Sequence, residues 1–272
     1  MVRRKVLLSV VVVGIFSSAA FALAPMGPPM AAVPQGQYAA GLGYAFSDMN
    51  LEVSGPLSGL PGGAAVLNDV QVNMYYGALV YGISDDWNVY AAAGMAGAEF
   101  PGDAAAPDFD GDDKFAYAVG CKRTLAKDEE TGTVWGTVFQ FAQGRSEDTV
   151  TTTSSAYGTW GNGAVSIPAP SEASSRKIDA ELDWYAIQLA VGPTIPLCEG
   201  VNLYGGPFLH LVEADLEVKT SRYEYELEQH VELGGYVGLQ AELGDPNTLL
   251  GAEFLWTGEA WGFGIGATFL MP

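Results

Sequence analysis

The chain contains few basic residues and few cysteines. Its 12 lysines and arginines face 32 aspartates and glutamates, which gives a formal net charge of -20. A chain this acidic repels nucleic acid and anionic lipid patches and attracts cations or basic partners, so no nucleic-acid partner is expected. The only cysteines, Cys121 and Cys198, form no C-x-x-C redox motif and no zinc motif. One predicted strand separates their segments, so whether they pair stays open.

The sequence also offers little for catalysis. General acid–base or nucleophilic chemistry needs a histidine beside a carboxylate or a serine, and only His210 and His230 are present. His230 has acidic neighbours in its own segment, but no motif of paired aspartates or of serine accompanies it. No phosphate-binding glycine loop, nucleotide fingerprint or metallohydrolase motif occurs either. We therefore expect a protein that is not an enzyme and has no cofactor.

Segments with helical periodicity are missing, and only one long apolar run is present. This run, Val6–Phe16, follows three basic residues and precedes the small residues SSAAFALA. That order is typical of a secretory signal peptide, with cleavage expected after Ala22. An uncleaved anchor is the alternative, but the run is short for a span of about 20 residues. We therefore expect a signal peptide at 1–22, a proline-rich extended tether at 23–36 and one folded unit at 37–272.

Glycine, aromatic residues and alternating segments are abundant. The 35 glycines and the aromatic content of 11% suit turn-rich β-structure better than helices. From residue 37 onward, apolar and polar residues alternate with a period of two. Two segments, 176–192 and 201–219, change phase midway, which indicates either bulges or strands that are wrongly assigned. The predicted strands are 37–47, 69–83, 86–98, 113–124, 133–146, 176–192, 201–219, 222–243, 248–257 and 260–270.

The connections between these strands alternate in length. Long polar connections follow the first, third, fifth and seventh strands, and short turns follow the second, fourth, sixth and eighth. One end of the sheet therefore carries tight turns, and the other carries longer excursions. A soluble two-sheet sandwich buries its apolar faces inward, whereas a membrane barrel turns them toward lipid.

Three features favour the barrel over the sandwich. The number of strands is even, the turns alternate in length, and the chain ends on a strong strand. Aromatic residues also lie at strand ends, where an interfacial girdle places them: Trp87, Tyr90, Trp256 and Trp261. We predict an all-β fold, a single antiparallel up-and-down transmembrane barrel of about ten strands, with 8–12 as the range.

Two local sequences resemble those of Gram-negative outer-membrane β-barrel proteins. YGISDDWNVYAA (81–92) looks like a strand, short periplasmic turn and strand of such a barrel. The last strand, WGFGIGATF, is similar to the family's C-terminal assembly signal, although Gly262 replaces a polar residue and 270–272 extend past the aromatic end. The resemblance covers about 37–272 and implies an outer-membrane location. It also implies contact with outer-membrane lipid and the barrel assembly machinery, short turns in the periplasm and long loops outside.

The most distinctive content is a set of carboxylates on alternate positions. If the apolar residues of 222–243 face lipid, the acidic residues between them point into the lumen, together with those of neighbouring strands. His230 would join them. The predicted lumen-lining residues are Asp179, Glu181, Asp183, Glu213, Asp215, Glu217, Glu224, Glu226, Glu228 and Glu232.

Such a lumen leaves two functions open. It is either a narrow cation-preferring pore or a solvated inner wall of a structural barrel. Ten strands lie nearer the small barrels that side chains fill than the open channels of about 16–18 strands, and inward Gly262, Gly264 and Gly266 would leave room inside. We favour a structural or surface-exposed interaction protein with long extracellular loops and an unknown extracellular partner.

Two loops carry their own hypotheses. In DFDGDD (108–113), three aspartates at alternate positions suit calcium, but the glutamate of an EF-hand is missing, which favours a plain acidic loop. The stretch 147–175 is rich in threonine, serine and glycine, with Tyr157 and Trp160 as contacts for a partner. External loops on a rigid barrel serve either as recognition elements or as tolerant tips.

Overall fold

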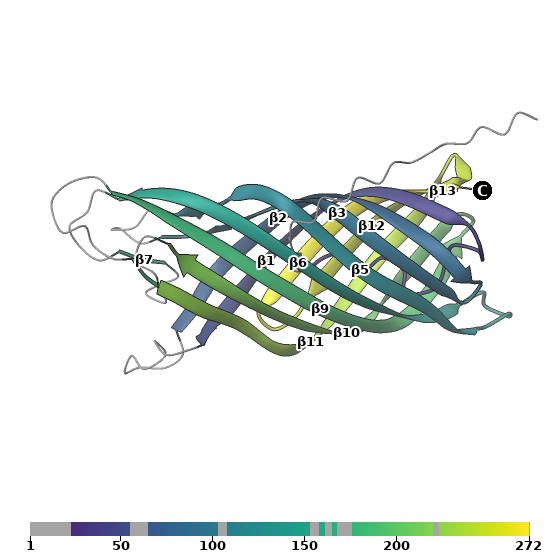
Figure 1. The fold of residues 1–272 in the computed structure, drawn as a ribbon. Coiled ribbons are helices and arrows are strands. Elements are labelled where there is room, and N and C mark those ends of the chain that lie inside the picture. Colours follow the sequence, from purple (N-terminus) through teal and green to yellow (C-terminus); the bar gives the residue numbers. More distant parts are fainter. Residues whose placement is uncertain are drawn as a thin grey trace, which may run out of the picture.

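The structure, a computed structural model, is an elongated barrel of β-strands (Figure 1). It describes residues 23–54, 65–102, 108–152, 158–160, 165–167, 176–219 and 223–271; the expected signal peptide therefore lies outside the described residues. No helix in this part of the chain is long and apolar enough to cross a membrane. The strands are β1 (Tyr38–Ser54), β2 (Ala65–Ser84), β3 (Trp87–Phe100), β4 (Phe109–Asp110), β5 (Asp112–Lys127), β6 (Val134–Thr152), β7 (Gly158–Trp160), β8 (Val165–Ile167), β9 (Arg176–Cys198), β10 (Val201–Val218), β11 (Tyr223–Leu243), β12 (Asp245–Trp256) and β13 (Ala260–Met271).

Ten of the described strands form a closed antiparallel ring. Its order is β1, β2, β3, β5, β6, β9, β10, β11, β12, β13, and β13 pairs back with β1. The short strand β4 adds to the edge of β3, and β7 and β8 form a separate two-stranded sheet. Closure removes the unpaired edges that a two-sheet sandwich would keep. The prediction of a ten-stranded barrel is confirmed, and the sandwich is wrong.

The two ends of the barrel differ, as the lengths of the connections predicted. At one end, the turn end, strands are joined by tight turns such as Asp85–Asp86 and Glu199–Gly200, and Gly200 takes a left-handed φ of 73° that suits glycine. The opposite end, the loop end, carries the longer connections and the β7–β8 hairpin. In Figure 1, β7 marks the loop end, and the C-terminus lies at the turn end.

The turn-end part of the barrel has an apolar outer surface. Large hydrophobic side chains on all ten ring strands point outward and are 40% or more exposed. Such a belt is stable only against lipid, because water would leave it unburied. We call it the membrane belt; one residue from each ring strand in order is Leu42, Leu79, Met95, Val119, Phe139, Leu189, Leu209, Leu239, Leu250 and Ile265.

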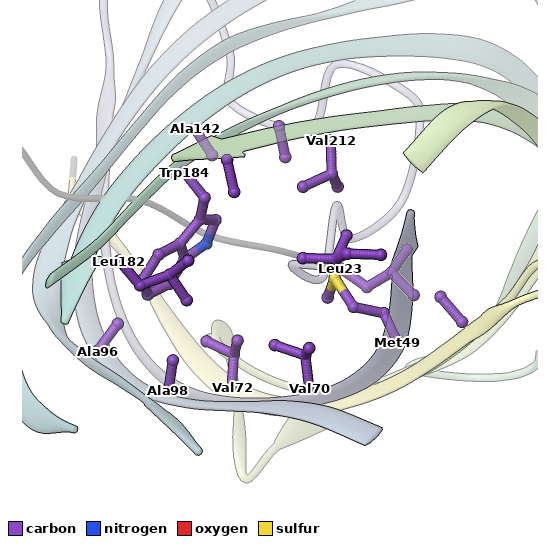
Figure 2. Packing of buried hydrophobic residues seen from close by; sticks show 14 of the residues in the cluster. Leu23, Met49, Val70, Val72, Ala96, Ala98, Ala142, Leu182, Trp184 and Val212 are labelled. Atoms are coloured by element: carbon purple, nitrogen blue, oxygen red, sulfur yellow. The ribbon is translucent and has the colours of Figure 1, made fainter. Parts of the chain in front are cut away.

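The loop-end part reverses this arrangement. Its inward side chains are apolar and buried in one cluster, which includes Met49, Val72, Leu182 and Trp184. Figure 2 shows these residues converging on the inside of the barrel from several strands. We call this cluster the upper core. The same strands thus change from apolar outside to apolar inside along their length.

A short hairpin contributes to this change. Strands β12 and β13 have 12 residues each, whereas β11 has 21. Above the hairpin, Glu52–Ser54 of β1 pair directly with Glu226–Glu228 of β11. The ring therefore narrows from ten strands to eight, and eight strands enclose a space that side chains can fill.

The aromatic residues expected at the membrane interfaces divide into two groups. Trp87 near the turn end, and Trp256 and Trp261 at the β12–β13 hairpin, are 37%, 43% and 43% exposed on the outer surface, as a girdle requires. Tyr90 is different, because it lies on the inward face of β3 and donates a hydrogen bond to Gln140 at 2.8 Å. Its assignment to the girdle is wrong, since it stands an odd number of residues from Trp87.

Candidate functional site

The outer face of the loop-end part of the barrel (the loop-end tier) is strongly acidic, and we call this face the outer wall. Its strands turn alternate side chains outward, while the residues between them enter the upper core. Nine of the ten carboxylates predicted to line the lumen lie here, on the outside: Asp179, Glu181, Asp183, Glu213, Asp215, Glu217, Glu224, Glu226 and Glu228. Their placement in the lumen was therefore wrong.

Two different features reverse the predicted orientation. In β10 no bulge occurs; the apolar face passes from outward Leu209 to inward Val212, and Glu213 then points outward. In β11 a bulge does occur, because His210 and Val212 of β10 pair with Glu232 and Gln229. One extra residue on β11 moves the rest of the strand to the opposite face.

Glu232 is the one predicted residue on the inward side of β11. It lies opposite His210 in the β10–β11 ladder. Its carboxylate accepts the backbone N–H of Glu259 at 3.3 Å, in the connection between β12 and β13. His210 is fully buried, and neither ring nitrogen has a hydrogen-bond partner among the described residues. The pair is not arranged as a proton-transfer couple.

Carboxylates of the outer wall face each other directly across strands. Asp215 of β10 lies opposite Asp183 of β9 on one side and Glu226 of β11 on the other. In the next row, Glu213 lies opposite Glu228. Like charges in such cross-strand positions repel and destabilise a sheet. A cation that lies against this surface therefore reduces the repulsion and stabilises the protein.

On the β6–β9 side of the outer wall, basic residues already supply part of the positive charge that compensates these carboxylates. Arg145 contacts Asp183 at 2.8 Å and Glu181 at 3.0 Å. Lys219 pairs with Glu181 and lies 3.9 Å from Glu147, which contacts Lys114 at 3.2 Å. These pairs form a chain of alternating charge across the strands. On the β10–β11 side, Asp215 instead lies among carboxylates of the neighbouring strands.

The protonation of the outer wall reflects this uneven distribution. Burial raises the pKa of Asp215, and repulsion from Glu224, Glu226 and Glu213 raises it further. Tyr185 donates a hydrogen bond to Glu213, which together with burial raises the pKa of Tyr185 to about 12. The raised pKa of Asp215 and the hydrogen bond donated to Glu213 are both local responses to excess negative charge.

Inside the membrane belt, the lumen holds the N-terminal segment 23–36. Leu23, Met26 and Val33 are almost fully buried there. The segment passes down the lumen until the N–H of Gly36 bonds the carbonyl of Gly82 at 2.8 Å, near the turn end. The segment was predicted as an extended tether; in the structure it forms no strand and is packed inside the barrel.

A buried carboxylate binds the upper part of this segment. Glu253 of β12 is 3% exposed and accepts the N–H groups of Met26 and Gly27, each at 2.8 Å. Gly27 has a left-handed φ of 67°, which turns consecutive N–H groups toward one anion. Farther down, Thr124 of β5 accepts the N–H of Ala31 at 3.2 Å.

Glycines on the inward face of β13 make room for the segment. A Cβ on Gly262 would lie 3.0 Å from the Cβ of Leu23, and a Cβ on Gly264 would overlap the ring of Pro25. The space predicted beside these glycines is present, and the N-terminal segment occupies it. Above the segment, the upper core fills the barrel.

Metal ligands do not converge in the described residues, where no group of three histidine, cysteine or acidic side chains is placed for an ion. In the 108–113 loop, Asp108 instead accepts the N–H of Gly102 at 2.8 Å, and Asp112 pairs with Lys114 at 3.6 Å. Cys121 and Cys198 are both free thiols. The calcium and disulfide alternatives therefore gain no support.

No protein-family model and no curated protein matches the chain. Solved structures do match its fold. The outer membrane protease OmpT from Escherichia coli superposes with a TM-score of 0.51 and 12% identity, over 89% of this chain and 99% of that one. The fold is that of a Gram-negative outer-membrane β-barrel. The barrel and its apolar belt place the protein in an outer membrane.

Two further outer-membrane structures show weaker similarity to this barrel. The translocator domain of the autotransporter NalP from Neisseria meningitidis has a TM-score of 0.45 and 11% identity, over 86% of this chain and 89% of that one. The attachment invasion locus protein Ail of Yersinia pestis has a TM-score of 0.34 and 13% identity, over 87% and 99%. At these identities, the activities of those proteins are not assigned to this chain.

The residues that hold the N-terminal segment were not predicted from the sequence. Glu253, Asn88 and Thr124 are polar residues within apolar alternation, and each lies on the inward face. A lone carboxylate at an inward position among leucine and alanine is the signal that was available. It indicates a fixed partner, because an unpaired buried charge is too costly.

Proposed function

We propose that the protein is a closed, non-catalytic outer-membrane barrel that acts at the cell surface through its acidic outer wall. The carrying observation is the concentration of carboxylates on the outer face of β10 and β11, where Glu213 lies opposite Glu228 and Asp215 lies in the next row. These like charges destabilise the isolated protein because they repel each other. A cationic partner that neutralises them removes this repulsion, which favours the complex. Long loops face the exterior in outer-membrane barrels, so the partner is a cationic molecule outside the cell.

The position of the outer wall supports this role. It begins directly above the membrane belt, where Leu209 and Val231 give way to Glu213 and Glu228. A cationic molecule lying on the membrane surface can contact it without entering the barrel. The loops of the 147–175 stretch add a second contact region, to which β6, β7 and β8 contribute.

The competing role is a cation-preferring pore, and the filled lumen argues against it. The N-terminal segment occupies the membrane belt, and the upper core occupies the loop-end tier. Nine of the ten carboxylates invoked for cation selectivity lie outside. A conducting barrel would require the displacement of both fillings.

Absence of catalysis is part of the proposal. OmpT is a protease, and its activity does not transfer at 12% identity. His210 is buried in the barrel wall, away from solvent and substrate, and Glu232 contacts the Glu259 N–H rather than His210. These contacts support a surface-binding role over an enzymatic one.

The decisive experiment measures binding of a fluorescent oligo-lysine peptide to the barrel in zwitterionic nanodiscs. The variant D215N/E224Q/E226Q removes three charges from the outer wall, and we expect peptide affinity to fall about tenfold or more. The control E129Q/E130Q/E199Q removes the same charge at the turn end and should bind as the wild type does. Equal affinity of both variants would contradict the proposed site.

Conductance separates the pore from the closed barrel. In planar bilayers, we expect no channel steps from the wild type. Substituting Glu253 by alanine removes the acceptor of the Met26 and Gly27 N–H groups, and it should produce transient openings if the segment blocks the membrane belt. Steady wild-type conductance with cation preference would establish the pore instead.

A further inference from the structure

A cavity remains beside the N-terminal segment in the lumen. It has a volume of about 190 Å³ and lies between the segment and the inner faces of strands including β1, β2, β12 and β13. Its apolar lining includes Met30, Val80, Ala92, Leu249 and Leu270. An apolar cavity of about 150 Å³ is large enough for benzene. The space therefore suits a small molecule.

The cavity exists because one part of the wall has no side chains. Inward-facing Gly251 of β12 has only a backbone oxygen, Leu239 O, within 4 Å of where its Cβ would stand, at 3.9 Å. At the neighbouring Gly266, the nearest atom would be the backbone oxygen of Leu42 at 3.0 Å. Adjacent glycine positions on neighbouring strands leave a hollow that the segment does not fill.

One cation faces this space. Lys122 of β5 lines the cavity together with Glu253. Glu253 is occupied by the N–H groups of Met26 and Gly27. Among the described residues, the Lys122 ammonium makes no hydrogen bond or ion pair; it lies 5.7 Å from the ring centre of Tyr90 and is attracted by the nearby Glu253 carboxylate. An ammonium with unused donors seeks an oxygen acceptor.

We propose that the cavity binds a small, mostly apolar molecule carrying one oxygen acceptor, such as a phenol or a ketone. The apolar body lies against the glycine wall of β12 and β13, and the oxygen accepts a hydrogen bond from Lys122. Leu249 and Leu270 lie near the turn end of their strands, so the molecule enters from that end. This site is independent of the outer wall, because it lies inside the membrane belt.

Fluorine NMR with 4-fluorophenol tests the site in the full-length barrel in nanodiscs. We expect a saturable bound resonance in the wild type, distinct from the lipid-partitioned one. Gly251→Leu places a side chain in the cavity, where its Cβ meets no close atom, and should weaken binding about tenfold or more. Ala91→Leu places a leucine on the lipid-facing side of β3, outside the cavity lining, and should bind normally.

A second variant isolates the polar contact. Lys122→Met keeps the length of the side chain but removes the ammonium, so 4-fluorophenol should bind more weakly while fluorobenzene binds unchanged. Heat-modifiable migration on a gel confirms that each variant is folded. The proposal fails if the wild type shows no saturable resonance, if folded Gly251→Leu binds as well as Ala91→Leu, or if Lys122→Met binds both probes normally.

Discussion

Asn88 of β3 pairs with Val33 through both ends of its side-chain amide. Nδ2 donates to the Val33 carbonyl at 2.7 Å, and Oδ1 accepts the Val33 N–H at 3.0 Å. Asn88 is only 1% exposed, and its Oδ1 also accepts the N–H of Ala32 at 2.8 Å. One side chain thereby satisfies the backbone of a segment that has no strand partner of its own.

Replacing Asn88 by alanine should loosen the N-terminal segment. The backbone groups of Ala32 and Val33 would lose their partner, and each buried unsatisfied group costs about 1–3 kcal/mol. We expect amide hydrogen exchange of 26–33 to rise by at least about tenfold while exchange in the ring strands stays constant. Asn73→Ala, on the outward face of β2, is the control; unchanged exchange in Asn88→Ala would contradict the role of this residue.

The bulge in β11 should be essential to the loop-end tier. Deleting His230 removes the extra residue, so one half of β11 must present the wrong face. Either Tyr225 and Leu227 leave the upper core, or Leu233 and Val237 leave the membrane belt. We expect failure to give the heat-modifiable band of a folded barrel, whereas His230→Ala should fold. Normal migration of the deletion variant would show that the strand tolerates the shift.

Tyr185 should lose its proton only at unusually high pH, because its hydroxyl donates a hydrogen bond to Glu213. Its pKa is raised to about 12, first by this hydrogen bond and then by burial. A raised tyrosine pKa stabilises the folded state below the ordinary value of 10.0, and this contribution is lost as the pH rises toward 12. Ring-labelled tyrosine NMR should show the pKa falling in Glu213→Gln but not in Glu217→Gln. A Tyr185 pKa that ignores Glu213 would refute the assignment.

Arg145 should matter more for stability than Lys114. Arg145 contacts both Glu181 and Asp183, and the Glu181 side chain is 10% exposed. Its replacement by methionine leaves Glu181 with Lys219 alone, and we expect a loss of about 1–3 kcal/mol in urea unfolding. Lys114 pairs with exposed carboxylates, so Lys114→Met should cost less than about 1 kcal/mol. Similar losses in both variants would indicate that burial of Glu181 is unimportant.

The strands were predictable because alternation survives in both tiers. The predicted 201–219 differs from β10 by one residue, and the predicted 260–270 differs from β13 by one. The predicted 37–47 stopped seven residues short of the end of β1, which continues to Ser54. That extension reads NLEVS after Met49, where the apolar residues have passed to the inward face.

The orientation of the acidic residues was not predictable from alternation alone. A period of two separates two faces but does not say which face is inside, and the answer depends on the solvent outside. Beside lipid, Leu209 must point outward; above the membrane, Leu216 must point inward. The phase change in 201–219 marks this boundary, and its interpretation as a bulge was wrong for β10.

The filling of the lumen was equally hidden. The segment 23–36 has no periodicity, because a chain inside a barrel contacts wall on every side. Its proline-rich composition is also that of a free linker. Two contacts distinguish a lumen-filling segment from a free linker: Pro25 packs against Gly264, and Glu253 accepts the N–H groups of Met26 and Gly27. Both join residues far apart in the sequence, so the local sequence does not predict them.

The seam of the ring lies between its first and last strands, β1 and β13. The segment that fills the lumen is joined to β1 and passes directly beneath that seam, against Gly262 and Gly264. Once Tyr38–Met49 of β1 have formed their twelve residue pairs with β13, the segment cannot pass between these two strands into the lumen. In the closed ring the segment can therefore enter or leave the lumen only along the barrel axis.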